Sequence, residues 1–151
     1  MSEKQELLSE LRVIYDGEAW HANNLSEILA GISHEQAAAK PIPAAHSIWE
    51  LVLHIAGWNE TFAARLEGKN QLEPVDGDFP AVAERSPRAW QAALERLRRS
   101  HEKMLEVFAK QAESNFANQF DDRDYTLSFF LHGTVRHIVY HSAQIAILKK
   151  A

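Results

Sequence analysis

Two histidines stand four residues apart near the C-terminal end of the chain, His137 and His141. On a helix, that spacing places both side chains on one face, one turn apart. Two imidazoles in this arrangement can bind one cation through nitrogen atoms at about 2.0–2.1 Å. The same helical line carries Phe130, Thr134, Gln144 and Leu148, which predicts that it faces inwards. Because a buried polar group without a partner costs on the order of 1–3 kcal/mol, the rings should bind a metal or make hydrogen bonds.

A third nitrogen ligand has to come from another inward-facing stripe, and His54 is the best candidate because its predicted helix face is otherwise apolar. Spacing alone does not show that His54 reaches the depth of the pair. The alternative is that all three residues are hydrogen-bonded core histidines. Glu50, one turn earlier, can orient His54, but its spacing from Ser47 favours an N-terminal capping box.

The chain has eight histidines, and the other five receive separate predictions. His21 lies on the apolar line of the first predicted helix. It is a tentative catalytic residue that either orients a metal ligand or faces the substrate, and the alternative is a core residue. His101 interrupts a stripe of Trp, Leu, Met and Phe, and we expect a hydrogen-bonded core histidine there. His132 is expected to be structural or interfacial. His34 and His46 lie in a predicted connector, as capping or surface residues.

Composition limits what this chain can be. Its 151 residues predict one domain, residues 1–151, and its 46% apolar content suffices for one core. It has no cysteine, and therefore no disulfide, no cysteine-based zinc site and no thiol nucleophile. The formal charge of −5 argues against a nucleic-acid partner. No apolar run approaches the roughly 18–20 residues of a membrane span, and no secretory signal is visible, so we expect a cytoplasmic protein.

Four stretches of the chain show the helical apolar period, and none shows sustained alternation. They run from about residue 3 to 30, 47 to 67, 86 to 108 and 126 to 149, with one helical turn expected at 33–39. Four such helices predict an all-α fold, a four-helix bundle. Residues 69–85 lack periodicity, and a loop of that length is usually functional or a crossover. It could join two helices that run in the same direction.

Taken together, these motifs resemble those of the DinB/YfiT-like family within the DinB superfamily of bacterial four-helix bundles. The resemblance covers almost the whole chain. It lies in His46–Ala56, which resembles the family's second-helix motif, and in Tyr125–Gly133 and His137–Ile145, which resemble its fourth-helix motif; Glu18–His21 resembles the first-helix segment of some members. It implies an up-down-down-up bundle in which His54, His137 and His141 are the three metal ligands. It also implies a homodimer.

Three histidines on one divalent ion leave positions open for water or substrate, which is the pattern of catalytic rather than structural sites. Zinc or nickel is the expected metal. Such an ion can lower the pKa of a bound water or activate a thiolate. The resemblance favours a thiol S-transferase that acts on small electrophiles with a low-molecular-weight thiol, such as bacillithiol or mycothiol, as co-substrate. A metal-dependent hydrolase and a non-enzymatic metal-binding stress-response bundle are the alternatives.

Overall fold

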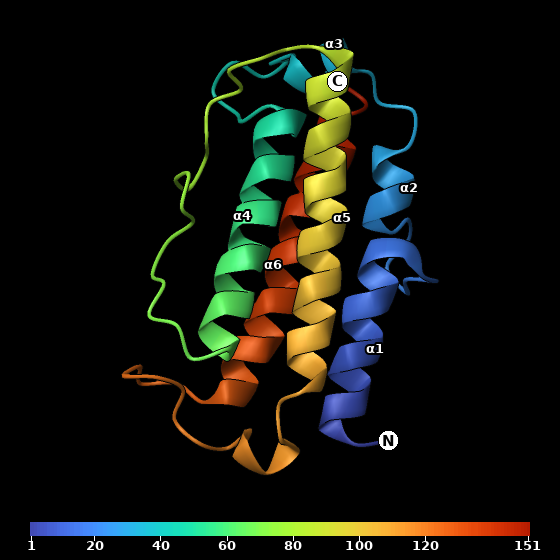
Figure 1. Ribbon diagram of the computed structural model, residues 1–151. Helices are drawn as coiled ribbons and strands as arrows, with labels where there is room; N and C mark the ends of the chain where they lie inside the picture. The colour runs from blue at the N-terminus through green and yellow to red at the C-terminus, as the bar shows by residue number, and fades with distance from the viewer.

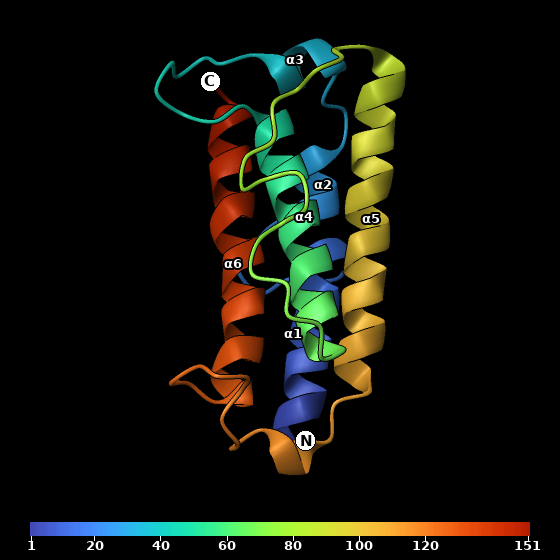
Figure 2. The same ribbon diagram turned by 60° about the vertical axis from the view of Figure 1, so that its left-hand side comes forward.

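Four long helices stand side by side along the length of the molecule in the computed structural model, which describes all 151 residues (Figure 1). The helices are α1 (Glu3–Asp16), α2 (Leu25–Leu29), α3 (His34–Ala38), α4 (Ile48–Leu66), α5 (Pro87–Ala109), the 3₁₀ helix η1 (Glu113–Asn115) and α6 (Leu127–Leu148). In both ribbon views α1 runs up, α4 and α5 run down and α6 runs up (Figures 1 and 2). The predicted all-α, up-down-down-up bundle is therefore confirmed.

Short polar side chains begin each of these α-helices. Ser47 accepts a hydrogen bond from the backbone of Glu50, whose side chain in turn accepts one from the backbone of Ser47 at 2.7 Å. The side chain of Thr126 accepts a hydrogen bond from the backbone of Phe129 at the start of α6, and Ser86 caps α5 with Pro87 as its first helical residue. The predicted helix starts are confirmed because each cap satisfies backbone N–H groups that have no partner inside the helix.

The first helix is shorter than predicted. We expected one helix from Glu3 to Ala30, but α1 ends at Asp16 and the chain turns before α2. Gly17 ends α1 with an extended backbone, and a Cβ at that position would lie 2.7 Å from the Cα of Val13. Asn24 then caps α2, while its side-chain amide donates to the Gly17 carbonyl at 2.9 Å. These side-chain hydrogen bonds stabilise the turn between α1 and α2 in place of one continuous helix.

A single cluster of 29 buried apolar residues fills the bundle and has members on every α-helix. α6 is apolar around most of its circumference, whereas α5 presents a strongly charged outer face. None of the helices combines the length and the hydropathy that crossing a bilayer requires.

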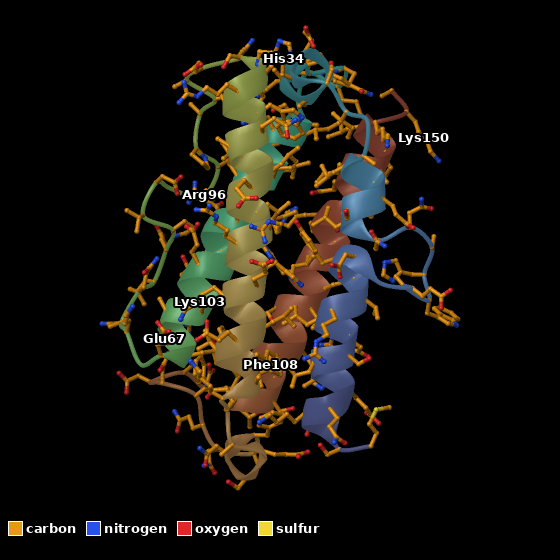
Figure 3. The ribbon with its side chains drawn as sticks, turned by 45° about the vertical axis from the view of Figure 1, so that its right-hand side comes forward. His34, Glu67, Arg96, Lys103, Phe108 and Lys150 are labelled. Atoms are coloured by element: carbon orange, nitrogen blue, oxygen red, sulfur yellow. The ribbon has the colours of Figure 1, made fainter.

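The crossover segment, residues 67–86, returns along the outside of the bundle from the end of α4 to the beginning of α5 (Figure 2). Arg96 on α5 lies beside this segment (Figure 3) and binds Asp76 at 2.6 Å and Glu60 of α4 at 2.7 Å. Pro74 packs so closely on Gly57 that a Cβ there would lie 3.0 Å from the proline ring. The segment is therefore fixed against α4 at the level where the predicted ligand histidine stands.

Candidate metal centre

The antiparallel run of α4 and α6 brings three histidines from separate parts of the chain to one depth. His54 stands six residues after the beginning of α4, and His141 stands seven residues before the end of α6. Nε2 of His54 lies 3.0 Å from Nε2 of His137 and 3.0 Å from Nε2 of His141. The potential ligand atoms of the three residues all lie within 4.8 Å of one another. Because α4 and α6 run antiparallel, His54 lies level with His137 and His141 along the bundle, which the residue spacing alone did not show.

The hydrogen-bond partners of the Nδ1 atoms determine which nitrogen of each imidazole ring carries the proton. Nδ1 of His54 lies 2.7 Å from the backbone carbonyl of Asp78, which only accepts hydrogen bonds. Nδ1 of His141 lies 2.6 Å from Oε1 of Gln144, which also only accepts. Each neutral ring must therefore hold its proton on Nδ1 and present a lone pair on Nε2.

Two lone pairs facing each other at 3.0 Å repel unless a positive centre lies between them. A proton is disfavoured there because burial lowers the pKa of His54, His137 and His141, that of His137 to about 3. Tetrahedral ligands at about 2.1 Å from one zinc ion would lie about 3.4 Å apart, close to the observed spacing. The three residues could therefore hold a divalent metal ion.

His137 differs from the other two histidines in its surroundings. Its Nδ1 is buried and has no hydrogen-bond partner. Its ring packs edge-on against Phe62, with centroids 5.6 Å apart, and against Trp58 at 6.3 Å. Apart from the 3.0 Å approach of its Nε2 to Nε2 of His54, the ring of His137 is held by packing, and no acceptor fixes its Nδ1.

The crossover segment supplies the remaining contacts of the centre. Besides its carbonyl, Asp78 places a carboxylate oxygen 3.2 Å from Nδ1 of His54 and accepts a hydrogen bond from the indole of Trp58 at 2.7 Å. The ring of Phe79 stacks on His54 at 4.1 Å and on His46 at 3.6 Å. One side of His54 is therefore covered by an aromatic ring, which excludes water, while its Nδ1 is fixed by two oxygens.

Sequence reasoning did not single out Asp78, Phe79 or Gln144 as functional residues. Asp78 and Phe79 come from the segment that was predicted only to be a functional loop or a crossover, and no motif marks them. Gln144 lies on the same helical line as the histidine pair, three residues after His141. A buried ligand imidazole needs an acceptor for its second nitrogen, so the position of Gln144 one turn after His141 could have predicted this contact.

The remaining predictions have mixed outcomes. Glu50 caps α4 and pairs with Lys40 at 3.0 Å rather than contacting His54. His101 is buried in the core as expected, but neither of its ring nitrogens has a hydrogen-bond partner, so the expected hydrogen bond is absent. Its ring stacks on Tyr15 at 4.5 Å instead.

The structure does not place His21 on a helix. It lies exposed in the turn between α1 and α2, and no hydrogen bond links it to the three histidines. His132 lies 3.4 Å from a carboxylate oxygen of Glu3 and so connects α6 to α1, the structural role expected for it.

Comparison with known proteins agrees with this architecture. A family model described as the DinB superfamily matches residues 19–145. That range contains α4, α5, nearly all of α6 and the three converging histidines. A search of the curated proteins and one of the solved structures give no match.

Proposed function

The chain belongs to the DinB superfamily, and we propose that it binds one divalent metal ion through His54, His137 and His141 to transfer a thiol to small electrophiles. The observation that carries the proposal is the pair of facing Nε2 lone pairs of His54 and His141, 3.0 Å apart. Zinc and nickel suit three imidazole ligands. When bound, such an ion lowers the pKa of a coordinated thiol or water.

The residues around the three histidines have distinct parts in this proposal. Asp78 and Gln144 hold the Nδ1 protons of His54 and His141, so that both Nε2 atoms stay available as ligands. Phe79 and Phe62 give the centre apolar walls, which strengthen electrostatic interactions inside it. The carboxylate of Asp78 is partly exposed and adjacent to the centre, so it can accept the proton that the thiol loses.

The proposed reaction balances without an oxidant or reductant. The thiol sulfur forms a bond to the electrophilic carbon, the bond from that carbon to its leaving group breaks, and the leaving group departs with the electron pair. The thiol proton passes to Asp78 and then to solvent. Only groups of this chain, the metal ion and the two substrates take part.

A conjugation assay tests the proposal. Metal-free protein is loaded with zinc or nickel and mixed with bacillithiol and a small haloalkane, and the thioether product is measured. We expect turnover that a chelator abolishes and that His54→Gln removes, while His132→Gln, a control on α6 away from the centre, retains it. Turnover of an ester without any thiol would favour the hydrolase instead. A loaded protein with neither activity would favour a non-enzymatic metal-binding bundle.

We also propose that the protein acts as a homodimer. The support is that α6 leaves large apolar side chains exposed, among them Phe129, Tyr140 and Ile147, each about 60% accessible. Exposed apolar residues that gather on one helix are typical of an interface.

A further inference from the structure

Few backbone contacts hold the crossover segment to the bundle. Residues 78–85 make no hydrogen bond from backbone to backbone, and the side chains of Leu72 and Val75 are exposed. The one backbone group of residues 78–85 that makes a hydrogen bond to α4 is the carbonyl of Asp78, which accepts from Nδ1 of His54 at 2.7 Å. The position of that carbonyl, and with it the orientation of a predicted ligand ring, therefore depends on what holds the neighbouring residues.

The turn just before Asp78 is the firmly held part of the segment. The N–H of Gly77 donates to the carbonyl of Pro74 at 3.0 Å, and the φ of Gly77 is +92°, a conformation that favours glycine. Pro74 is buried against Gly57, where an added Cβ would lie 3.0 Å from its ring. Glycine weakens a helix interior relative to alanine, and this close approach gives the reason for a glycine in α4. The turn therefore rests on α4 three residues after His54.

Arg96 fastens this turn to two helices at once. Its guanidinium donates to both carboxylate oxygens of Asp76, at 2.6 and 3.2 Å, and to both of Glu60 on α4, at 2.9 and 2.7 Å. An isolated exposed ion pair adds little to stability, but a guanidinium that binds two carboxylates bidentately has a fixed geometry. Asp76 lies two residues before Asp78, so the same contact fixes the backbone that carries the carbonyl on His54.

We propose that Arg96 is a positioning residue for the metal centre, and that metal binding and attachment of the crossover segment stabilise each other. The inference rests on the proposed metal binding by the three histidines. While the turn is attached, the carbonyl of Asp78 holds the Nδ1 proton of His54 and leaves Nε2 free for the ion. When the turn is released, His54 loses this acceptor together with the ring of Phe79. An ion bound at Nε2 in turn keeps the proton on Nδ1 and so strengthens the contact that holds the segment.

A merely structural role of Arg96, as a bridge between α4 and α5, is separable from positioning because its two carboxylate partners lie on different elements. Asp76→Asn removes the charged partner on the crossover segment and leaves the pair with Glu60 in place. Glu60→Gln removes the charged partner on α4 and leaves the pair with Asp76 in place. Positioning predicts that only Asp76→Asn affects the metal centre, whereas a bridge between helices predicts an effect of Glu60→Gln.

Competition titration with a chromophoric zinc chelator measures the effect on metal binding. Arg96→Ala and Asp76→Asn should each weaken zinc binding about 10-fold, the lower end of the range for a lost orienting contact. Glu60→Gln should leave the affinity unchanged. So should Arg98→Ala, which removes an arginine whose carboxylate partners all lie on α5 itself. Wild-type affinity in Asp76→Asn, or an equal loss in Glu60→Gln, would overturn the proposal, whereas a wild type without zinc affinity would refute the metal centre itself.

Limited proteolysis measures the reciprocal effect on the crossover segment. Subtilisin has broad specificity, and its cleavage rate follows the population in which a segment is released from the fold. Saturating zinc should slow cleavage between residues 69 and 86 at least about 10-fold, because coupling between two equilibria is reciprocal. Cleavage between residues 113 and 125, in the other irregular stretch, should keep its rate. Zinc that leaves cleavage of the crossover segment unchanged, or slows both stretches equally, would refute the coupling.

Discussion

Removing the acceptor of Gln144 should weaken metal binding without unfolding the bundle. Gln144→Leu keeps the volume of the side chain but leaves Nδ1 of His141 without the oxygen that now lies 2.6 Å from it. The ring is then free to move its proton to Nε2, which removes the lone pair that faces Nε2 of His54. Loss of such an orienting contact typically lowers metal affinity 10- to 100-fold, or about 1.4–2.7 kcal/mol.

Competition titration with a chromophoric zinc chelator measures this affinity at pH 7.5. Gln111→Leu is the matched control, because Gln111 is also half-buried and its amide donates to Leu66 at 3.2 Å at the opposite end of the bundle. We expect the control to lower thermal stability while zinc affinity stays the same. Gln144→Glu should retain affinity, because a carboxylate accepts the same proton. Equal zinc affinity of Gln144→Leu and wild type would show that the contact does not orient His141 for metal binding.

Three further predictions concern metal content and pH. Elemental analysis of the reconstituted protein should find about one divalent ion per chain, and His137→Gln should reduce this to nearly none with unchanged helical circular dichroism; a metal-free wild type would contradict the proposed centre. Metal affinity should stay level from pH 8 to about pH 6.5 and fall only at lower pH, because burial lowers the pKa of His54, His137 and His141 and keeps the ligand imidazoles neutral; a loss of affinity already between pH 8 and 6.5 would contradict ligation by these buried rings. His101, whose pKa burial lowers to about 4, should make the metal-free fold less stable as pH falls from 6.5 towards 4, since the unfolded chain binds the proton more readily. The effect is up to about 3 kcal/mol, and urea titrations should show a weaker pH dependence for His101→Leu than for wild type; equal dependence would mean that His101 is not the group responsible.

The sequence predicted the helices well where a capping residue and a long apolar stripe coincide. Ser47 with Glu50, and Ser86 with Pro87, mark helix starts by local hydrogen bonding and backbone geometry, which depend only on neighbouring residues. It failed between Gly17 and Asn24, where two local preferences competed and the apolar period continued across the break. His21 was assigned to a helix face for that reason.

The residue types and spacing of the sequence determined which histidines could share a face, since four residues on a helix always return the chain to the same side. Only the tertiary structure decided that α4 and α6 run antiparallel, with the first half of α4 beside the second half of α6. This arrangement brings His54 to His137 and His141. It alone placed the carbonyl of Asp78 and the ring of Phe79 against His54. Asp78 and Phe79 lie 24 and 25 positions after His54, in a segment without periodic sequence. The path of that segment depends on its packing against α4 and α5, which no local sequence pattern encodes.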